Sequence, residues 1–258
     1  MANNDTIKKT IIVTLLLCFA CSVVVSSAAV LLRPMQIANQ ELDFKRNILA
    51  AANMLDGRDI ETVFAERIVT RVIRLETGSY ADDEVPDGFQ NRAASRDPSL
   101  STNLNNREDI AGINRREDYS LVYLVEDSDG NLEKIILPVR GYGLWSTMWG
   151  FIALEADANT IMGIGFYEHG ETPGLGGEID NPRWQANWEG KKIYDEDGSV
   201  AFTVLKGSVD SGSPQAQYQV DGLSGATLTA RGVHNMMQFW MGDKGFRPFL
   251  MNLQDGEA

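Results

Sequence analysis

Cysteine is almost absent from this 258-residue chain, and its position limits what it can do. Both cysteines, Cys18 and Cys21, lie in one apolar stretch near the N-terminus, so the rest of the chain cannot form a disulfide. A Cys-x-x-Cys pair supplies only two of the four ligands that zinc or an iron–sulfur cluster usually takes. In a membrane helix such residues are most often small apolar fillers, and ligands shared with another protein of a complex are the alternative. We therefore expect this chain to hold no metal by itself.

Histidine is equally sparse, which argues against several kinds of active site. His169 and His234 have no nearby partners in the sequence that would complete a zinc site or a nucleophilic site. The chain also lacks a P-loop, and its glycine-rich segment has Ile179 where the dinucleotide fingerprint G-x-G-x-x-G requires its last glycine. The chain therefore offers neither of these two sequence motifs for binding a nucleotide.

Positive charge is scarce after the N-terminal region. The formal net charge is −13, and residues 41–258 hold 20 basic and 35 acidic side chains. A surface this acidic repels phosphate backbones, which excludes nucleic acid as an expected partner. The excess of acidic residues keeps the domain soluble, and attraction of cations or of a basic partner is the alternative interpretation.

Charge is completely absent from one long stretch, Thr10 to Leu32. Its 23 residues would form a helix of roughly 34 Å, enough to cross a hydrocarbon core of about 30 Å. Lys8 and Lys9 precede it, so the positive-inside rule places the N-terminus in the cytoplasm and the main domain in the periplasm. A cleaved signal peptide with a site near Ser26-Ser27-Ala28 is the alternative, but the apolar run continues past that site. We expect a single-pass anchor in the bacterial inner membrane.

The rest of the chain divides by its hydrophobic pattern. Helical spacing of apolar residues predicts helices over 36–55 and 59–73, and residues 77–117 are polar with little period. The turn Asp127–Asn131 between two apolar runs predicts a hairpin of strands at 121–125 and 134–138. Further strands are expected at 150–156, 161–167 and 201–206, and helical spacing returns after Thr227.

These patterns predict the α+β class, with an N-terminal transmembrane helix followed by one mainly antiparallel domain that has flanking helices. We divide the chain into four parts. These are a cytoplasmic N-terminus at 1–9, a transmembrane anchor at 10–32, a helical and polar linking region at 33–117, and a ligand-binding domain at 118–258.

The segment Asp221-Gly222-Leu223-Ser224-Gly225-Ala226-Thr227 precedes the last helical pattern. Unpaired N–H groups at a helix N-terminus suit a phosphate, although a plain helix cap has the same appearance. The string resembles the D-x-x-S/T-G-A-T flavinylation motif of the FMN-binding domain family. The resemblance implies that Thr227 carries FMN through a phosphoester bond, that Ser224, Gly225 and Ala226 surround the attachment point, and that Asp221 is read by the flavin transferase. Thr229 is a second hydroxyl nearby, but only Thr227 follows Gly-Ala.

A second segment, Glu171-Thr172-Pro173-Gly174-Leu175-Gly176, concentrates glycine after an apolar strand. By spacing alone it is either a surface loop or a backbone that bends tightly around a ligand. E-T-P-G-L-G is also a hallmark of the same family, and the resemblance implies that this loop lines the flavin. Trp145 and Leu175 are candidates for the apolar faces against the ring, although an aromatic beside glycines is often simply core. Thr172 and the backbone at Gly174 to Gly176 are candidates for its polar edge, and Lys206, Lys191 or Lys192 could offset the phosphate charge.

The resemblance extends over nearly the whole chain to the C subunits of bacterial Na⁺-translocating NADH:quinone oxidoreductases. It rests on the segments ILPVRGYGLWSTMWGF, ETPGLGGEIDNPRW, WEGKK and VDGLSGATLT. It implies an electron relay with covalent FMN as cofactor, fed from NADH through a membrane iron–sulfur centre. From there electrons would pass to a second FMN-bearing subunit and then to ubiquinone, coupled to outward Na⁺ transport. A protein of the Rnf-type electron-transport complex is the alternative within the class, and a membrane-tethered module without a redox role is the alternative outside it.

Overall fold

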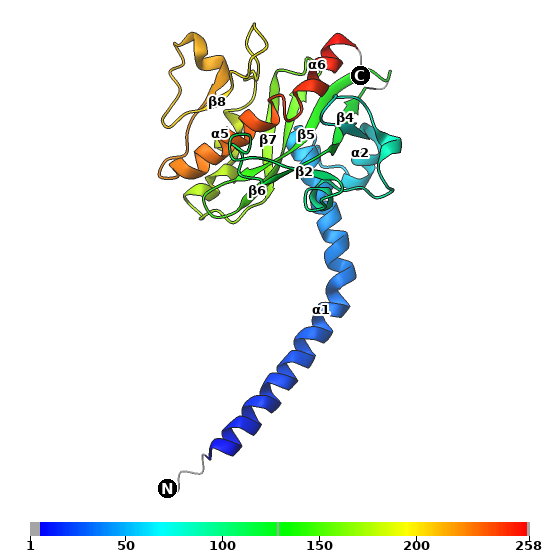
Figure 1. The fold of residues 1–258 in the computed structure, drawn as a ribbon, viewed down its shortest axis with the longest axis vertical. Helices are drawn as coiled ribbons and strands as arrows, with labels where there is room; N and C mark the ends of the chain where they lie inside the picture. The colour runs from blue at the N-terminus through cyan, green and yellow to red at the C-terminus, as the bar shows by residue number, and fades with distance from the viewer. Residues whose placement is uncertain (1–5, 128, 257–258) are drawn as a thin grey trace. The chain divides into compact units, whose positions relative to one another are not determined.

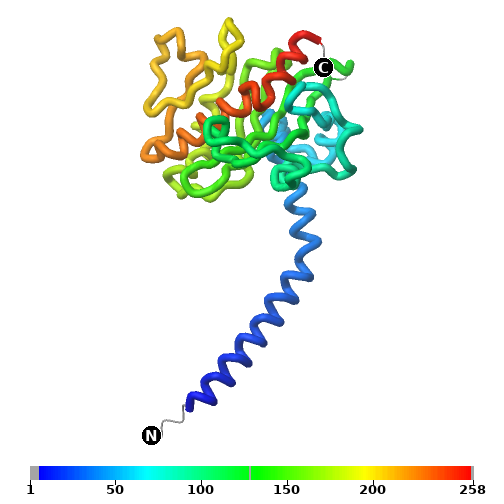
Figure 2. Tube along the Cα trace, in the orientation of Figure 1, coloured from blue at the N-terminus to red at the C-terminus, as the bar shows by residue number. Residues whose placement is uncertain are grey.

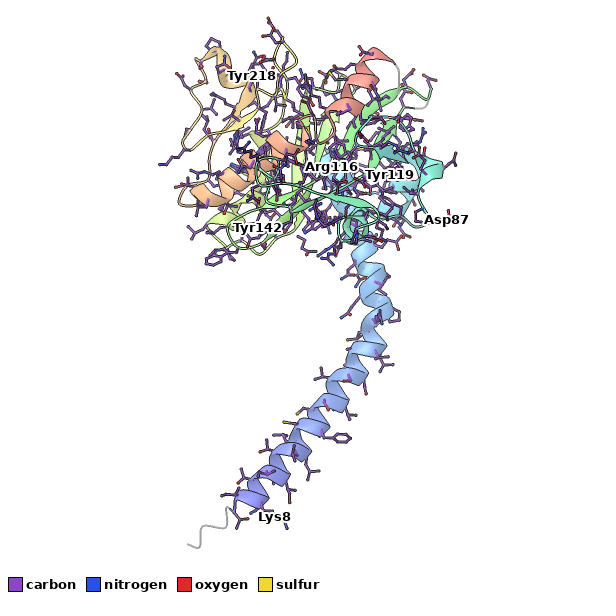
Figure 3. The ribbon with its side chains drawn as sticks, viewed as in Figure 1. Lys8, Asp87, Arg116, Tyr119, Tyr142 and Tyr218 are labelled. Atoms are coloured by element: carbon purple, nitrogen blue, oxygen red, sulfur yellow. The ribbon has the colours of Figure 1, made fainter. Side chains whose placement is uncertain are left out.

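The computed structural model describes residues 6–127 and 129–256 and divides into two compact units, residues 1–44 and 45–258 (Figure 1). From Ile7 onward the first unit is part of helix α1, Ile7–Ala51, which is the one helix in the described ranges long and apolar enough to cross a membrane. The helices expected before and after Pro34 form one continuous helix that contains this proline. Lys8 lies in its first turn (Figure 3). The last turns of α1 belong to the second unit, where Ile48 and Leu49 are buried.

The second unit is built on a five-stranded antiparallel sheet with the strand order β1-β4-β5-β6-β7 (Figures 1 and 2). Its strands are β1 Ile68–Arg74, β4 Tyr119–Glu126, β5 Leu132–Tyr142, β6 Thr147–Glu155 and β7 Ile161–Glu168. The predicted hairpin is confirmed, because β4 and β5 pair across the Asp127–Asn131 turn. The strands expected at 150–156 and 161–167 are also confirmed.

The helix expected over 59–73 is wrong in its second half. Helix α2 covers only Ile60–Arg67, with Asp59 as its N-cap, and the chain continues directly into strand β1. Val72 and Ile73 fit a helical stripe, but the β-branched run from Ile68 onward pairs along its whole length with β4. The five-stranded sheet therefore begins inside the region that the sequence presents as a link.

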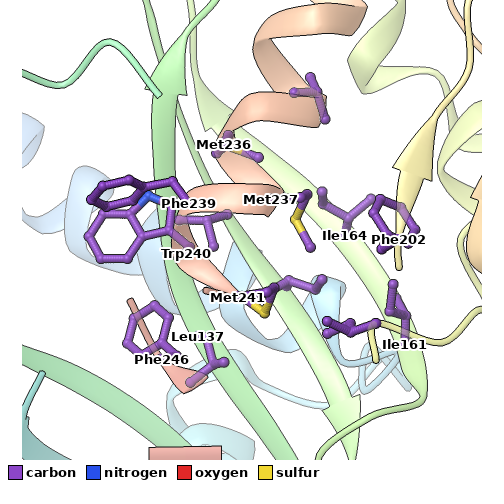
Figure 4. Packing of buried hydrophobic residues seen from close by; sticks show 14 of the residues in the cluster. Leu137, Ile161, Ile164, Phe202, Met236, Met237, Phe239, Trp240, Met241 and Phe246 are labelled. Carbon is purple, nitrogen blue, oxygen red and sulfur yellow. The ribbon is translucent and has the colours of Figure 1, made fainter. Parts of the chain in front are cut away.

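Apolar residues cover both faces of the sheet, since side chains along a strand alternate between its faces. Leu137 and its neighbours two residues away, Ile135 and Val139, pack in one large core cluster with helix α5, Thr227–Trp240 (Figure 4). On α5 the residues Met236, Met237 and Trp240 are buried in the same cluster. This confirms the helical pattern predicted after Thr227.

The other face of the sheet is lined by aromatic rings. Tyr123 of β4 packs edge-on against Phe64 of α2 and against Phe151 of β6, and Phe151 stacks on Tyr167 of β7. The end of α1 closes this side, since Lys134 Nζ donates to the Ala52 carbonyl at 3.1 Å. The sheet is thus a central layer with helices on both faces.

Short elements complete the second unit. The polar region 77–117 contains η1 Asp82–Glu84, α3 Asn91–Ala94 and the antiparallel pair β2 Ser101–Asn103 and β3 Arg115–Glu117. The strand expected over 201–206 is reduced to β8, Thr203–Val204, which pairs in parallel with β9, Gln219–Val220. The remaining elements are η2 Gly176–Asp180, α4 Pro182–Ala186, η3 Pro214–Tyr218 and α6 Arg247–Asp255.

A buried ion pair joins β5 to the polar region. Arg140 is 5% exposed and Glu117 is 3% exposed, and Arg140 Nη2 donates to Glu117 Oε2 at 2.6 Å. The same nitrogen donates to the Arg115 carbonyl at 2.7 Å, and Trp240 Nε1 donates to the Arg140 carbonyl at 2.7 Å. The pair therefore connects β3, β5 and α5 inside the core.

Helix α5 approaches the end of β5 very closely at Gly232. A Cβ there would stand 2.4 Å from the Tyr142 carbonyl oxygen, well inside contact distance. We expect Gly232→Ala to destabilise the protein by about 1–3 kcal/mol, because overpacking forces the helix away from the strand. Thermal unfolding of this variant beside Gly207→Ala, where a Cβ would meet no atom within 4 Å, checks the prediction. Equal melting temperatures for the two variants would contradict the close packing.

Candidate functional site

One buried carboxylate, Glu171, joins three segments that are far apart in the sequence. It lies in the loop after β7 and is 5% exposed. Its Oε1 accepts from the N–H groups of Leu144 at 3.0 Å and Trp145 at 2.9 Å, in the turn between β5 and β6. Its Oε2 accepts from Thr229 Oγ1 at 2.6 Å, in the first turn of α5. The segments that contain the predicted site residues Trp145, Thr172 and Thr227 thus meet at this side chain.

Two glycines leave room for that carboxylate. A Cβ at Gly143 would stand 2.5 Å from Glu171 Oε1, and a Cβ at Gly176 would stand 2.8 Å from Oε2 and 2.5 Å from Thr229 Oγ1. Any larger residue at either position would displace the junction. The glycine content of these segments therefore has a packing reason as well as a conformational one.

Hydrogen bonds keep Glu171 ionised. Burial alone would raise its pKa, but the bonds from Thr229, Trp145, Leu144 and Ser146 to the carboxylate together lower it. A carboxyl with a lowered pKa stabilises the fold above its pKa in the unfolded chain. That stabilisation is lost as the pH falls through the lowered pKa of Glu171. At neutral pH the carboxylate is ionised, so it stabilises the junction.

Large apolar side chains are exposed around this junction. Trp145 is 64% exposed, Leu175 is 46% exposed and Leu144 is 39% exposed, and we call these three the apolar patch. A Cβ at Gly225 would stand 3.1 Å from Leu175 Cδ2, so the patch reaches the loop before α5. Tyr142, at the end of β5, donates from its hydroxyl to the Trp145 carbonyl at 3.3 Å (Figure 3). Exposed apolar surface of this kind is suited to contact with a flat apolar group.

The two threonines at the start of α5 differ in solvent exposure. Thr227 is the first residue of the helix and its side chain is exposed, whereas Thr229 is 1% exposed and donates to Glu171. The N-cap is Ala226, whose side chain cannot satisfy the N–H groups of the first turn. Those groups and the positive end of the helix dipole suit an anionic group beside Thr227.

A cavity of about 160 Å³ opens beside Thr227 on the face of α5 that also carries Ala230, Arg231 and His234. Its opposite wall is formed by residues 204–206, so Lys206 and Arg231 both line it. His234 is half-buried, and burial lowers its pKa, which keeps the ring neutral at pH 7. Lys191 and Lys192 do not line this cavity, and Lys191 Nζ donates instead to the Ala216 carbonyl at 2.7 Å.

The other predicted site residues lie around Thr227. Ser224 and Gly225 are exposed, and Gly225 has a φ of +74°, which a residue with a side chain rarely adopts. Thr172 and Gly174 are exposed in the loop that contains Glu171. Asp221 is oriented differently, since its Oδ1 accepts from the Val209 N–H at 2.7 Å and its carboxylate anchors a neighbouring loop.

Sequence reasoning did not assign a role to Glu171, Arg231 or Leu144. The motif E-T-P-G-L-G contains Glu171, but its partners Trp145 and Thr229 are 26 and 58 positions away. The feature of the sequence that could have indicated a role for Glu171 is its position in a glycine-rich loop directly after an apolar strand. Within the described residues there is also no group of three or more His, Cys, Asp or Glu side chains that could hold a metal ion.

Comparison with known proteins agrees with these features. Residues 143–242 match the FMN-binding domain family, and this range contains the apolar patch, Glu171 and Thr227. The residues present fit such a ligand, because they combine an apolar surface, a helix N-terminus and a cavity with two basic side chains. The fold and site therefore define a flavoprotein domain of the FMN-binding class.

Relatives over the full length define the family more narrowly. The chain is 51% identical to the C subunit of the Na(+)-translocating NADH-quinone reductase of Pseudomonas aeruginosa, with all of both chains covered. It is 47% identical to the protein of the same name from Vibrio alginolyticus, over 99% of this chain and 98% of the relative. The crystal structure of NqrC from Shewanella oneidensis superposes with a TM-score of 0.77 at 37% identity, covering 84% of this chain and 99% of that one. The chain belongs to the NqrC family, the C subunits of the Na(+)-translocating NADH-quinone reductases.

Proposed function

We propose that this protein carries FMN covalently on Thr227, through a phosphoester bond to the threonine side-chain oxygen. The observation that carries the proposal is the position of Thr227, exposed at the N-terminus of α5 beside a cavity with two basic side chains. Thr229 also carries a hydroxyl in the first turn of α5, but it is buried and bonded to Glu171. Accessibility therefore favours Thr227, as the flavinylation motif does.

The surrounding residues support each part of such a ligand. Lys206 and Arg231 line the cavity beside Thr227 and would offset the charge of the phosphate. The apolar patch of Leu144, Trp145 and Leu175 would contact the ring. Backbone groups of this loop, at Thr172 and from Gly174 to Gly176, would bond its polar edge; Thr172 and Gly174 are exposed, whereas Gly176 is buried. Ser224, Gly225 and Ala226 shape the loop around the attachment point, and Asp221 is assigned to recognition by the flavin transferase.

The role that follows is an electron relay within a Na⁺-translocating NADH:quinone oxidoreductase, a membrane translocase of several subunits. FMN supplies one-electron exchange when it is bound, and the chain supplies its tether, its surroundings and its placement. Electrons would arrive through a membrane iron–sulfur centre and leave to a second FMN-bearing protein of the complex on the way to ubiquinone. Membership of the NqrC family favours this role over the Rnf-type alternative.

The mass of the peptide that contains Thr227 tests the attachment. Protein produced together with the flavin transferase is expected to yield this peptide with an added FMN group, and protein produced without the transferase is the control. A peptide of unmodified mass from both preparations would leave the membrane-tethered module without a redox role as the better interpretation.

The chain is proposed to cross the inner membrane once, with residues 1–9 in the cytoplasm and 10–32 in the bilayer. Residues 33–117 and the covalent FMN-binding domain at 118–258 would lie in the periplasm. Support comes from Lys8 and Lys9 before the apolar part of α1, which is the sole candidate span in the part of the chain that the structure describes.

A reporter fusion checks this orientation. Alkaline phosphatase, which is active only outside the cytoplasm, is expected to be active when fused after Ala258 and inactive when fused after Lys9. β-galactosidase, which is active only in the cytoplasm, should show the opposite pattern. Activity of the second reporter after Ala258 would reverse the proposed topology.

A further inference from the structure

We propose that Glu171 is a positioning residue for the flavin site and that its buried negative charge lowers the reduction potential of the FMN held there. The inference rests on the proposed attachment of FMN to Thr227 and extends it to a residue that the attachment itself does not require. It concerns a side chain that does not reach the surface, since Glu171 is 5% exposed.

The positioning role follows from the contacts of the carboxylate. Each of the three segments that present the proposed ligand surface is bonded to it. The turn with Leu144 and Trp145 donates two N–H groups, and Thr229, two residues after Thr227, donates its hydroxyl. The third segment is the loop of Glu171 itself, which carries Leu175. The apolar patch and the attachment point are therefore fixed relative to one another through a single side chain.

The electrostatic role follows from what is missing around that carboxylate. All of the hydrogen bonds that it accepts come from neutral groups, namely three backbone N–H groups and one hydroxyl. In the described part of the chain, no Lys, Arg or His nitrogen lies within 4 Å of it, whereas the other fully buried carboxylate of this domain, Glu117, is paired with Arg140. His169 contacts the backbone N–H of Glu171, but its other nitrogen pairs with Asp180 at 2.7 Å.

A fixed charge without a counter-ion changes the free energy with which any nearby group gains or loses charge. The backbone N–H groups of Leu144 and Trp145 bond to Glu171, so a ring placed on the side chains of Leu144, Trp145 and Leu175 would lie about one side-chain length beyond those bonded groups. The carboxylate opposes the addition of negative charge at that position, which lowers the reduction potential. Unit charges about 10 Å apart at an effective dielectric constant of about 20 change such an equilibrium by roughly tenfold.

Redox titration of the covalent flavin in the full-length protein tests the inference. Glu171→Gln preserves the size of the side chain and removes its charge. We expect its midpoint potential to shift to more positive values, with a change of about tenfold in the ratio of reduced to oxidised flavin, or about 59 mV for a one-electron couple. Glu189→Gln, which removes an exposed carboxylate outside the site, is the matched control and is expected to retain the wild-type potential.

A second variant keeps the test decisive if Glu171→Gln does not fold or does not accept flavin. Thr229→Val retains the charge of Glu171 but removes one hydrogen bond that offsets it, so its midpoint potential is expected to shift to more negative values. An unchanged potential in Glu171→Gln, or in Thr229→Val where the first variant yields no flavoprotein, overturns the inference. Absence of covalent flavin from the wild type is a different result, because it contradicts the attachment at Thr227 instead.

Discussion

Replacing Thr227 with valine is expected to remove covalent flavin from the protein completely. Valine has nearly the shape of threonine but lacks the oxygen that would form the phosphoester bond. The helix itself should be unaffected, because Ala226 and not Thr227 is the N-cap of α5 and the Thr227 side chain is exposed. The measurement is flavin fluorescence of the protein band after denaturing electrophoresis, with the transferase co-produced.

Thr229→Val is the matched control for this experiment. The same chemical change two residues further on removes a buried hydroxyl that donates to Glu171, and it leaves Thr227 in place. We expect the fluorescent band to persist in this variant. Fluorescence that survives Thr227→Val and disappears with Thr229→Val would exchange the roles of the two residues, and loss in neither variant would refute covalent attachment in this segment.

The second large effect is expected from Glu117→Ala. This change leaves Arg140 buried in the core without the carboxylate that lies 2.6 Å from its Nη2. Removal of one partner from a buried ion pair typically costs about 3–5 kcal/mol, because the remaining charge is desolvated without compensation. Guanidinium unfolding followed by tryptophan fluorescence measures this loss in the second unit alone, since all five tryptophans lie after residue 44.

An exposed ion pair provides the comparison. Asp243 is mostly exposed and pairs with Arg247 four residues further along the chain, so Asp243→Ala should leave the unfolding midpoint near that of the wild type. If Glu117→Ala also unfolds at the wild-type midpoint, then water or another group compensates Arg140. Such a result would contradict the close connection of β3, β5 and α5 described above.

Helices and strands were predicted best from the sequence where the spacing of apolar residues fits only one of the two. The hairpin of β4 and β5 was predicted because a turn sequence separates two apolar runs, and helix α5 was predicted because its apolar residues have helical spacing. Residues 68–73 were assigned to a helix because Val72 and Ile73 also fit helical spacing, and only pairing with β4 decides between the helical and the strand period. Tertiary contact overrides local pattern at this position.

The candidate site was likewise predicted only in part from the sequence. Short motifs indicated Thr227, Trp145 and Leu175, and the structure places these residues on segments that meet at Glu171. The role of Glu171 was not predicted, because its bonds join residues 26 and 58 positions apart. The buried pair of Arg140 and Glu117 was missed for the same reason, as charged residues in sequence give no indication that they lie inside a core.

The contrast between an exposed Thr227 and a buried Thr229 also bears on the order of maturation. The junction around Glu171 is complete within the polypeptide, so the hydroxyl of Thr227, the proposed attachment point, is exposed once the chain has folded. If FMN is attached as proposed, a transferase acting on the folded domain would reach Thr227 without local unfolding, whereas it would have to break a buried hydrogen bond to reach Thr229. Folding would then select one of the two threonines for modification.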